Sequence, residues 1–277
     1  MENRFVQRES IHNKSFCLVF GLMLLILGGC QKSKTTSQLP KITKNKFTKI
    51  FNGKNLNGWK YDPTYWSVKN GNLVGTITPS TIVKHNTFII WQGHVPSNFV
   101  LKVEYRITKN GNSGINYRSQ MVKGVPYALK GYQADIAGAA RYGPEKRVTG
   151  SNYEERRRTT LASIGQKVVL PSIPNADSLQ AHIKNNHWTA SIIKGSLGNR
   201  DSLEDHINFN GWNKYRIVVK GNHLKHYLNG VLMSDVTDND TTNRRFNGYV
   251  GVQVHVGPPM KVKFRNFRIK KLPGSNN

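Results

Sequence analysis

The sequence predicts an all-β fold, an antiparallel two-sheet jelly-roll sandwich, over residues 47–272. In most segments after residue 47, apolar side chains recur at every second position, the period of a strand with one buried face. Clusters of Asn, Gly, Ser and Pro separate these segments as tight turns do. Many short strands with such punctuation are typical of sandwiches and jelly rolls. With 277 residues, 37% of them hydrophobic, the chain can bury a sizeable core and is not of the disordered class.

The first 29 residues predict a signal peptide rather than part of the fold. Three basic residues precede an apolar run at 16–27, which has the length of a signal-peptide core and is short for a membrane span. The run ends in Leu27-Gly28-Gly29-Cys30, which resembles a bacterial lipobox. That resemblance implies cleavage before Cys30 and lipid on its thiol and new amino group. The alternative is an ordinary secretory peptide with a chance cysteine.

Residues 30–46 then read as the lipidated cysteine and a flexible, lysine-rich tether. Several acyl chains would anchor the protein stably, so we expect a membrane partner and a location in the bacterial cell envelope. Gln31, rather than an aspartate, follows Cys30 and favours the outer membrane, on its periplasmic or surface face. The sequence leaves the oligomeric state open.

The predicted strands follow in chain order, each justified by its alternation. They are residues 65–69, 73–78, 88–91, 99–107, 115–118, 132–136, 215–219, 224–228, 249–256 and 262–269. Asn229-Gly230 between two of them predicts a type I′ hairpin turn. Residues 137–210 break the pattern and are predicted to be a long irregular insert, and residues 273–277 a tail.

The charge balance points to anionic partners. The chain has 41 Lys and Arg against 15 Asp and Glu, a formal charge of +26. Such a field attracts lipid headgroups, lipopolysaccharide, acidic glycans or nucleic acid. The alternative is a basic surface that is simply solvated beside an anionic membrane. We expect no nucleic-acid partner, because the basic residues are spread over strands and loops without a recognition-helix or stacking pattern. Two cysteines, Cys17 and Cys30, exclude a disulfide framework, a Cys₄ zinc site and a CxxC redox centre.

The strand positions that alternate with the apolar ones form an unusually polar set. They include Glu104, Arg106, Asn116, Arg118, Gln133, Asp135, Gln253 and His255. On the concave sheet of a jelly roll, such side chains would line a groove suited to a polyhydroxylated ligand. The alternative is a solvated sheet face, on which Glu104 and Arg106 only pair with cross-strand neighbours.

Several stretches carry a family resemblance. They are FNGKNLNGW at 51–59, NSGINYRS at 112–119, GYQADI at 131–136, YEER at 153–156, GVQVH at 251–255 and FRNF at 264–267. In this order they resemble the 3-keto-disaccharide hydrolase family, formerly domain of unknown function 1080, over about residues 47–271. The resemblance implies a concanavalin A-like jelly roll and activity on sugars or glycosides oxidised at C3.

One departure from the family pattern follows the paired glutamates. Similar members carry Arg-Gly-Arg-Gly where this chain has Arg156-Arg157-Arg158-Thr159. Glycine permits a positive φ or a close ligand approach, so its replacement leaves the shape of this loop and the substrate open.

The chemistry on such a substrate can be argued from its ketone. A C3 ketone acidifies the C2 proton, so a base can form an enolate, and the anomeric substituent then leaves with the help of a general acid. Water adds back, or the unsaturated sugar is released. The site needs a base, an acid and donors at the enolate oxygen. We expect no redox cofactor, because no GxGxxG follows a strand.

The candidate residues follow from this list of needs. We predict Asp135 and Glu154 as acid and base, with His255 as a third catalytic candidate. The predicted substrate-binding residues are Glu104, Asn116, Arg118, Gln133, Arg158, Gln253 and Trp188, with the arginines at the enolate or hydroxyls and the tryptophan as a stacking platform. Trp212 is a second stacking candidate.

Three alternatives stay open beside this assignment. The Glu154-Glu155 pair before three arginines is also the pattern of a local ion-pair cluster. A divalent metal held by His255 and Asp135 is a second alternative, although no HExxH or other metal-binding spacing is present. The third is a lectin-like lipoprotein that binds carbohydrate without catalysis, because this scaffold also hosts lectins.

Overall fold

The computed structural model describes residues 39–44, 46–141, 148–174, 176–185 and 187–274. All of them belong to one compact unit, Gln38–Asn277. The predicted signal peptide and Cys30 lie outside the described residues, as does part of the predicted tether. No helix in the described ranges is both long and apolar enough to cross a membrane.

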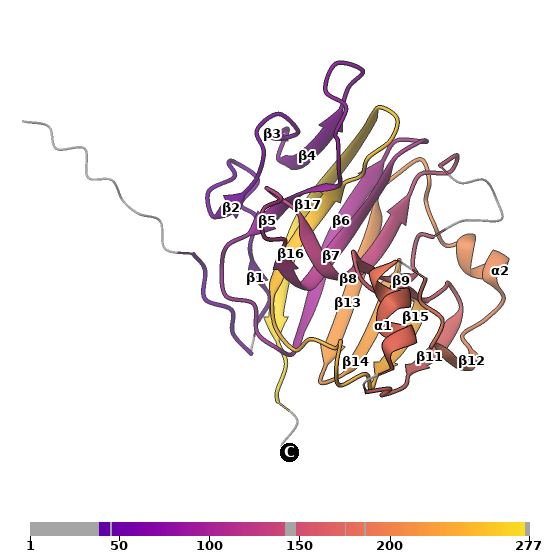
Figure 1. Ribbon diagram of the computed structural model, residues 1–277. Helices are drawn as coiled ribbons and strands as arrows, with labels where there is room; N and C mark the ends of the chain where they lie inside the picture. The colour runs from indigo at the N-terminus through magenta and orange to yellow at the C-terminus, as the bar shows by residue number, and fades with distance from the viewer. Residues whose placement is uncertain (1–38, 45, 142–147, 175, 186, 275–277) are drawn as a thin grey trace, which may run out of the picture. The chain divides into compact units, whose positions relative to one another are not determined.

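Two β-sheets form this unit (Figure 1). The larger has ten strands in the order β12-β11-β15-β14-β13-β6-β17-β4-β3, and β1 pairs with β17 beside this path. Its strands are β1 (Thr48–Lys49), β3 (Trp66–Lys69), β4 (Asn72–Ile77), β6 (Phe99–Ile107), β11 (Gln166–Leu170), β12 (Ile192–Ser196), β13 (Asn213–Lys220), β14 (His223–Leu228), β15 (Val231–Asp238) and β17 (Met260–Lys271).

The smaller sheet has seven strands in the order β10-β9-β8-β7-β16-β5-β2. They are β2 (Trp59–Lys60), β5 (Thr87–Trp91), β7 (Asn112–Met121), β8 (Leu129–Ala137), β9 (Asn152–Glu155), β10 (Thr159–Ala162) and β16 (Tyr249–Val254). Every pairing is antiparallel except that of β11 with β15, which is parallel. The all-β, two-sheet prediction is confirmed.

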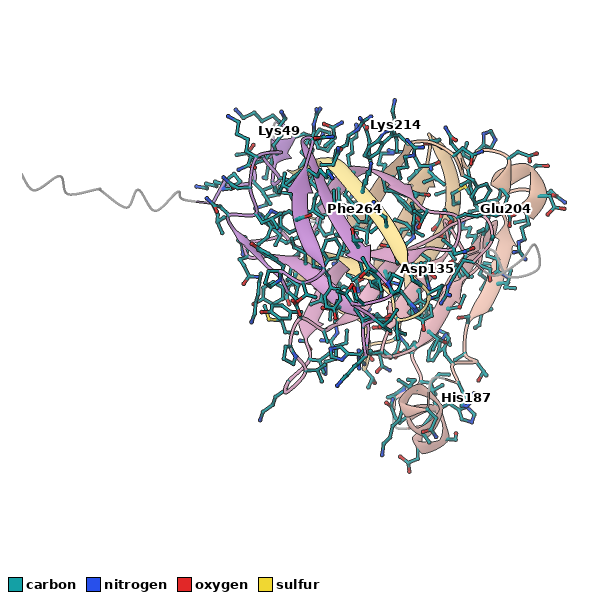
Figure 2. All side chains as sticks on the ribbon, turned by 90° about the horizontal axis from the view of Figure 1, so that it is seen from above. Lys49, Asp135, His187, Glu204, Lys214 and Phe264 are labelled. Atoms are coloured by element: carbon teal, nitrogen blue, oxygen red, sulfur yellow. The ribbon has the colours of Figure 1, made fainter. Side chains whose placement is uncertain are left out.

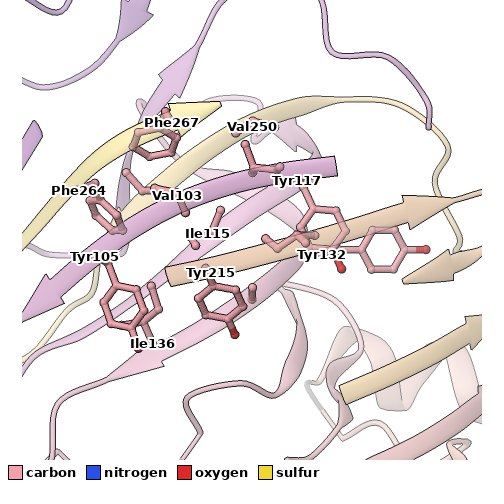
Figure 3. Close-up of a cluster of buried hydrophobic side chains, with 14 of the residues drawn as sticks. Val103, Tyr105, Ile115, Tyr117, Tyr132, Ile136, Tyr215, Val250, Phe264 and Phe267 are labelled. Atoms are coloured by element: carbon pink, nitrogen blue, oxygen red, sulfur yellow. The ribbon is translucent and has the colours of Figure 1, made fainter. Parts of the chain in front are cut away.

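The core lies between the sheets and follows from the alternation of the strands. Phe264 and Val103 of the larger sheet meet Ile115 and Val250 of the smaller one, and all are buried (Figure 3). Burial of such side chains contributes about 1.5–3 kcal/mol each. Because successive residues point to opposite faces, this packing turns the polar positions of both sheets outward.

The turn at Asn229-Gly230 is confirmed in detail. Leu228 pairs with Val231, and the two turn residues have φ values of 49° and 96°. Positive φ at both central positions is the requirement of a type I′ turn, and its twist matches that of the flanking strands.

The predicted irregular insert contains regular elements. Strands β9 to β12 lie in it and extend both sheets, and it also holds the helices α1 (Asp177–Lys184) and α2 (Arg200–Glu204) (Figure 1). Their sequences, such as NYEE in β9 and QKVVL in β11, do not alternate apolar and polar residues, so the pattern could not mark them.

Candidate active site

A polar cavity of about 310 Å³ lies on the face of the smaller sheet that points away from the core. It draws on β7, β8, β9 and β10 and on the residues next to β5 and β16. Its lining residues are Asn86, Asn112, Gln133, Asp135, Val148, Tyr153, Glu155, Arg156, Thr160 and His255.

A glycine makes room at the floor of this cavity. Gly114 on β7 is the cross-strand partner of Asp135 on β8. A Cβ atom at Gly114 would come within 2.4 Å of the Gln133 side chain, so no larger residue fits without displacing Gln133. The carboxyl group therefore lies beside a position without a side chain, where a ligand can approach.

Asp135 is a buried acid whose carboxyl group has only neutral partners. Gln133 Nε2 donates to Oδ1 at 2.7 Å and Ser151 Oγ lies 3.3 Å from Oδ2. Burial raises the pKa of Asp135 to about 7; the Gln133 hydrogen bond opposes this and the charge of Glu155 adds to it. Ser151 Oγ also donates to the Val148 carbonyl at 2.6 Å, so its oxygen can accept a hydrogen bond from a protonated Asp135.

Glu155 is the second carboxyl group of the cavity. Burial raises its pKa too, but Asn86 Nδ2 donates to it at 3.0 Å and Gln253 Nε2 at 3.3 Å, and Arg156 Nε lies 3.9 Å away. These donors and the guanidinium favour the carboxylate. The two acids therefore have different charged neighbours: Glu155 lies beside the cation Arg156, whereas Asp135 lies near the anion Glu155.

Buried amide oxygens lie on the same sheet face. The side-chain oxygens of Asn116, Gln133 and Gln253 have no hydrogen-bond partner in the described part of the chain, although all three residues are at most 3% exposed. A buried carbonyl oxygen without a donor is costly, by about 1–3 kcal/mol. Hydroxyl groups of a ligand, or water, would satisfy them.

His255 lies at the cavity wall just after β16. One ring nitrogen, Nδ1, lies 2.5 Å from the Val256 carbonyl oxygen. Burial lowers the pKa of His255, so its imidazole is neutral near pH 7. Because a carbonyl oxygen only accepts, Nδ1 carries the proton of this neutral ring, and Nε2 can accept a hydrogen bond or a proton.

A comparison with known protein families identifies the family of this chain. Residues 46–270 match the family described as the 3-keto-alpha-glucoside-1,2-lyase-like domain. The chain belongs to this family. The resemblance found from the motifs is confirmed, and the family is a carbohydrate-active one.

Solved structures are similar to this chain. A proposed glycosyl hydrolase from Parabacteroides distasonis is 18% identical with a TM-score of 0.52, over 82% of this chain and 100% of that one. A second one from the same organism is 19% identical (TM-score 0.48; 82% and 94% covered), and the carbohydrate-binding module CBM66 of Bacillus subtilis is 14% identical (0.46; 77% and 96%). No curated protein matches the chain.

The structure places Glu154 away from the cavity of this lyase-like domain. Glu154 pairs across the strands with Tyr132 and points between the sheets, where it is fully buried. Arg158 Nε donates to its carboxylate, and Arg157 Nε lies 3.3 Å from it. The prediction of Glu154 as a groove residue is therefore corrected, and the ion-pair alternative describes it. Glu155, one position on, takes its place because strand faces alternate.

Arg158 belongs to the same buried cluster rather than to the cavity. Its guanidinium donates to Asp238 at 2.7 and 3.1 Å and to Asp240 at 3.2 Å, and Tyr132 Oη donates to Asp238 at 2.5 Å. Trp188 covers the guanidinium, with its ring centre 5.5 Å away, and its Nε1 donates to Ser191. The structure thus gives Arg158 and Trp188 internal partners in place of the predicted sugar.

Arg118 is also turned away from the cavity. The ladder between β7 and β8 shifts register after Tyr117, and Arg118 has a φ of 45°. Its guanidinium donates to the carbonyl oxygens of Arg245 at 2.9 Å and Ser97 at 2.7 Å. A bulge of this kind re-aims a side chain, and no simple alternation could have revealed it.

Glu104 and Trp212 lie at the larger sheet. Glu104 accepts from Arg265 Nε at 2.8 Å and from Asn266 at 2.9 Å, and Arg265 lies 3.9 Å above the Trp212 ring. The cross-strand alternative therefore describes Glu104. Of the predicted residues, Asp135, Gln133 and His255 line the cavity, while Asn116 and Gln253 lie on the same sheet.

The loop that departs from the family pattern borders this site. Thr159, where similar members have glycine, has a φ of 56°, and Arg156 has a φ of 57°. A β-branched residue in this left-handed region is strained. The turn therefore keeps the backbone that glycine would favour, and it brings the Arg156 side chain to the cavity wall.

The metal alternative rests on His255 and Asp135. The described residues contain no group of three or more His, Cys, Asp or Glu that could hold a metal ion. These two residues do line one cavity, so a chelator belongs in any assay of this chain.

Proposed function

We propose that the chain is an enzyme that cleaves 3-keto-glycosides or 3-keto-disaccharides by removal of the C2 proton and elimination or hydrolysis of the glycosidic bond. The observation that carries this proposal is the pair of buried carboxyl groups, Asp135 and Glu155, in one polar cavity with different charged neighbours. Two acids whose environments push their pKa values apart are the usual basis of an acid–base pair.

The roles follow from those surroundings. Glu155 takes the C2 proton; burial raises its pKa, and the amide donors and Arg156 favour its carboxylate form against that effect. Arg156 stabilises the negative charge that develops on the C3 oxygen. His255, through its unprotonated Nε2, can accept a hydrogen bond or a proton from the substrate or from water. Asp135, kept protonated by burial, gives its proton to the departing anomeric oxygen. The buried side-chain amide oxygens of Gln133, Asn116 and Gln253 accept hydrogen bonds from the sugar hydroxyls.

The test compares substrates that differ only at C3. Protein without its first 30 residues is mixed with a 3-keto-glucoside and with the unoxidised glucoside, with and without chelator, and release of the aglycone is followed. We expect release from the keto compound alone, since only its C2 proton is acidic. Loss of release on chelation would assign a metal to the His255–Asp135 pair.

Variants assign the roles. Asp135→Asn and Glu155→Gln should each lower kcat by about 100-fold or more and leave sugar binding in place. Glu104→Gln is the matched control, because Glu104 lies on the other sheet and should keep full turnover. Equal loss in all three variants would refute the assignment.

The amide oxygens also favour a second candidate, a lectin-like protein that binds carbohydrate without turnover. No release from any keto-glycoside, together with measurable glycan binding that Gln133→Leu abolishes, would select it.

For either function we propose an envelope protein anchored through lipid on Cys30, supported by the Leu27-Gly28-Gly29-Cys30 motif. Mass spectrometry of the cell-derived protein, with acyl chains on Cys30 or without them, tests this.

A further inference from the structure

The outward face of the larger sheet carries a row of four cations in direct cross-strand register. Arg216 on β13 pairs with Lys102 on β6, Lys102 with Arg268 on β17, and Arg268 with Lys49 on β1. Neighbouring strands lie about 4.8 Å apart, so the row is about 14 Å long. Like charges directly opposite one another destabilise a sheet, so the row needs compensation from outside the chain.

Carboxylates on this face are few and already engaged. Glu104 binds Arg265 and Asn266, and Asp235 accepts from His223 and lies 3.4 Å from Lys225. Among the described residues, no carboxylate pairs with any member of the four-cation row. A merely solvated face would interleave the two signs.

Two hollows open on the same face. One of about 250 Å³ is lined by Lys102, Lys214, Arg216 and Arg268, with Glu104 beside them. The other, of about 610 Å³, is lined by the cations Arg106, Lys109, Lys261 and Lys263, and no carboxylate in the described part of the chain lines it. Each hollow therefore gathers four cations around a space that can receive a phosphate group.

Aromatic rings lie directly beneath several of these cations. The Arg216 guanidinium is 3.7 Å from the Tyr227 ring centre, and Lys102 Nζ is 4.6 Å from that of Phe47. Cations together with amphipathic aromatic side chains are the composition found at membrane interfaces.

We propose that the outward face of the larger sheet docks onto an anionic phospholipid bilayer and receives lipid phosphates in its two hollows. The chain enters this sheet at β1, and the proposed lipid anchor at Cys30 lies nine residues before Leu39, at most about 30 Å of extended chain. The docked face lies across the core from the cavity: in Figure 2, Phe264 separates Lys49 and Lys214 from Asp135. The cavity would then open away from the membrane.

The test uses protein that begins at Gln38, which keeps both sheets and the core but has no lipid anchor. It is mixed with sedimenting vesicles of phosphatidylglycerol and phosphatidylcholine in equal parts, and with phosphatidylcholine alone. We expect binding to the anionic vesicles only, weakened by added salt. Each basic residue near such a surface contributes about a fivefold factor, so replacing Lys102, Arg216 and Arg268 with glutamine should weaken binding about 100-fold.

A matched variant removes the same total charge from the smaller sheet and its β7–β8 turn. It replaces Lys60, Lys123 and Lys130 with glutamine. Its binding should stay within about threefold of the parent, and circular dichroism verifies the fold of both variants. Equal loss in the two variants, or no preference for anionic vesicles, overturns the proposal. Binding to a soluble sulfated polysaccharide without binding to vesicles would assign the face to an acidic glycan instead. Turnover of 3-keto-glycosides is measured without vesicles, so neither result depends on the other.

Discussion

Asp135 should reduce stability at neutral pH in exchange for its chemistry. The folded protein holds the Asp135 proton up to a pH of about 7, whereas the unfolded chain releases it near the ordinary aspartate pKa of 3.8. Between these values the folded state binds one proton more, so the free energy of unfolding falls as pH rises. A difference of about three pKa units corresponds to about 4 kcal/mol above pH 7.

Asp135→Asn removes this penalty with little change of shape. The amide can still accept from Gln133 and can donate to Ser151 Oγ, whose own proton is held by the Val148 carbonyl. We therefore expect the variant to be more stable than the parent by about 4 kcal/mol at pH 8 and by about 2 kcal/mol at pH 5.

Urea unfolding at the two pH values measures the difference. Asp205→Asn, at an exposed position, is the control and should change the free energy of unfolding by less than about 0.5 kcal/mol. A gain for Asp135→Asn that is the same at pH 5 and pH 8, or no gain at pH 8, would refute the reasoning, because only a buried titrating acid gives this pH dependence.

Three further outcomes are expected. The kcat/KM for a 3-keto-glycoside should fall as pH rises through about 7, because the general acid Asp135 loses its proton, and a profile that rises across this range would contradict that role. Arg158→Met should lower the free energy of unfolding by about 3–5 kcal/mol in urea, since it leaves Asp238 buried without its cation and Glu154 with Arg157 alone. A neutral effect would mean that the cluster is not essential to the fold. Thr159→Gly should raise the free energy of unfolding by about 1–2 kcal/mol, because glycine adopts a positive φ without strain. A lower free energy of unfolding would show that the threonine side chain contributes more stability than the strained backbone costs.

Much of the sandwich was open to prediction from sequence because its signals are local. The alternation in 99–107 fixes which residues are buried, and Asn229-Gly230 defines its own turn. The short strands of the insert, such as β9 and β10, gave no such signal, because their sequences, NYEE and TTLA, do not alternate apolar and polar residues.

The site was predictable only in part. Asp135 and Gln133 share one face of β8 by alternation, and the same rule applied to β9 assigns Tyr153 and Glu155 together and Glu154 to the opposite face. To decide which of the two adjacent glutamates faces the cavity, one must know the register in which β9 pairs with β8. That register depends on contacts between segments distant in the sequence. Arg118 could not have been placed at all, because a bulge reversed its direction.

By itself the sequence determined the two-sheet class, the family and the polar character of one strand face, because these depend on residue type and spacing along the chain. The tertiary structure decided which charges neutralise one another and which stay exposed. Arg158 meets Asp238 across 80 positions of sequence, and Lys102 meets Arg216 and Arg268 across two strand pairings. Electrostatic roles depend on distance and burial in space, and neither is written in the spacing of residues.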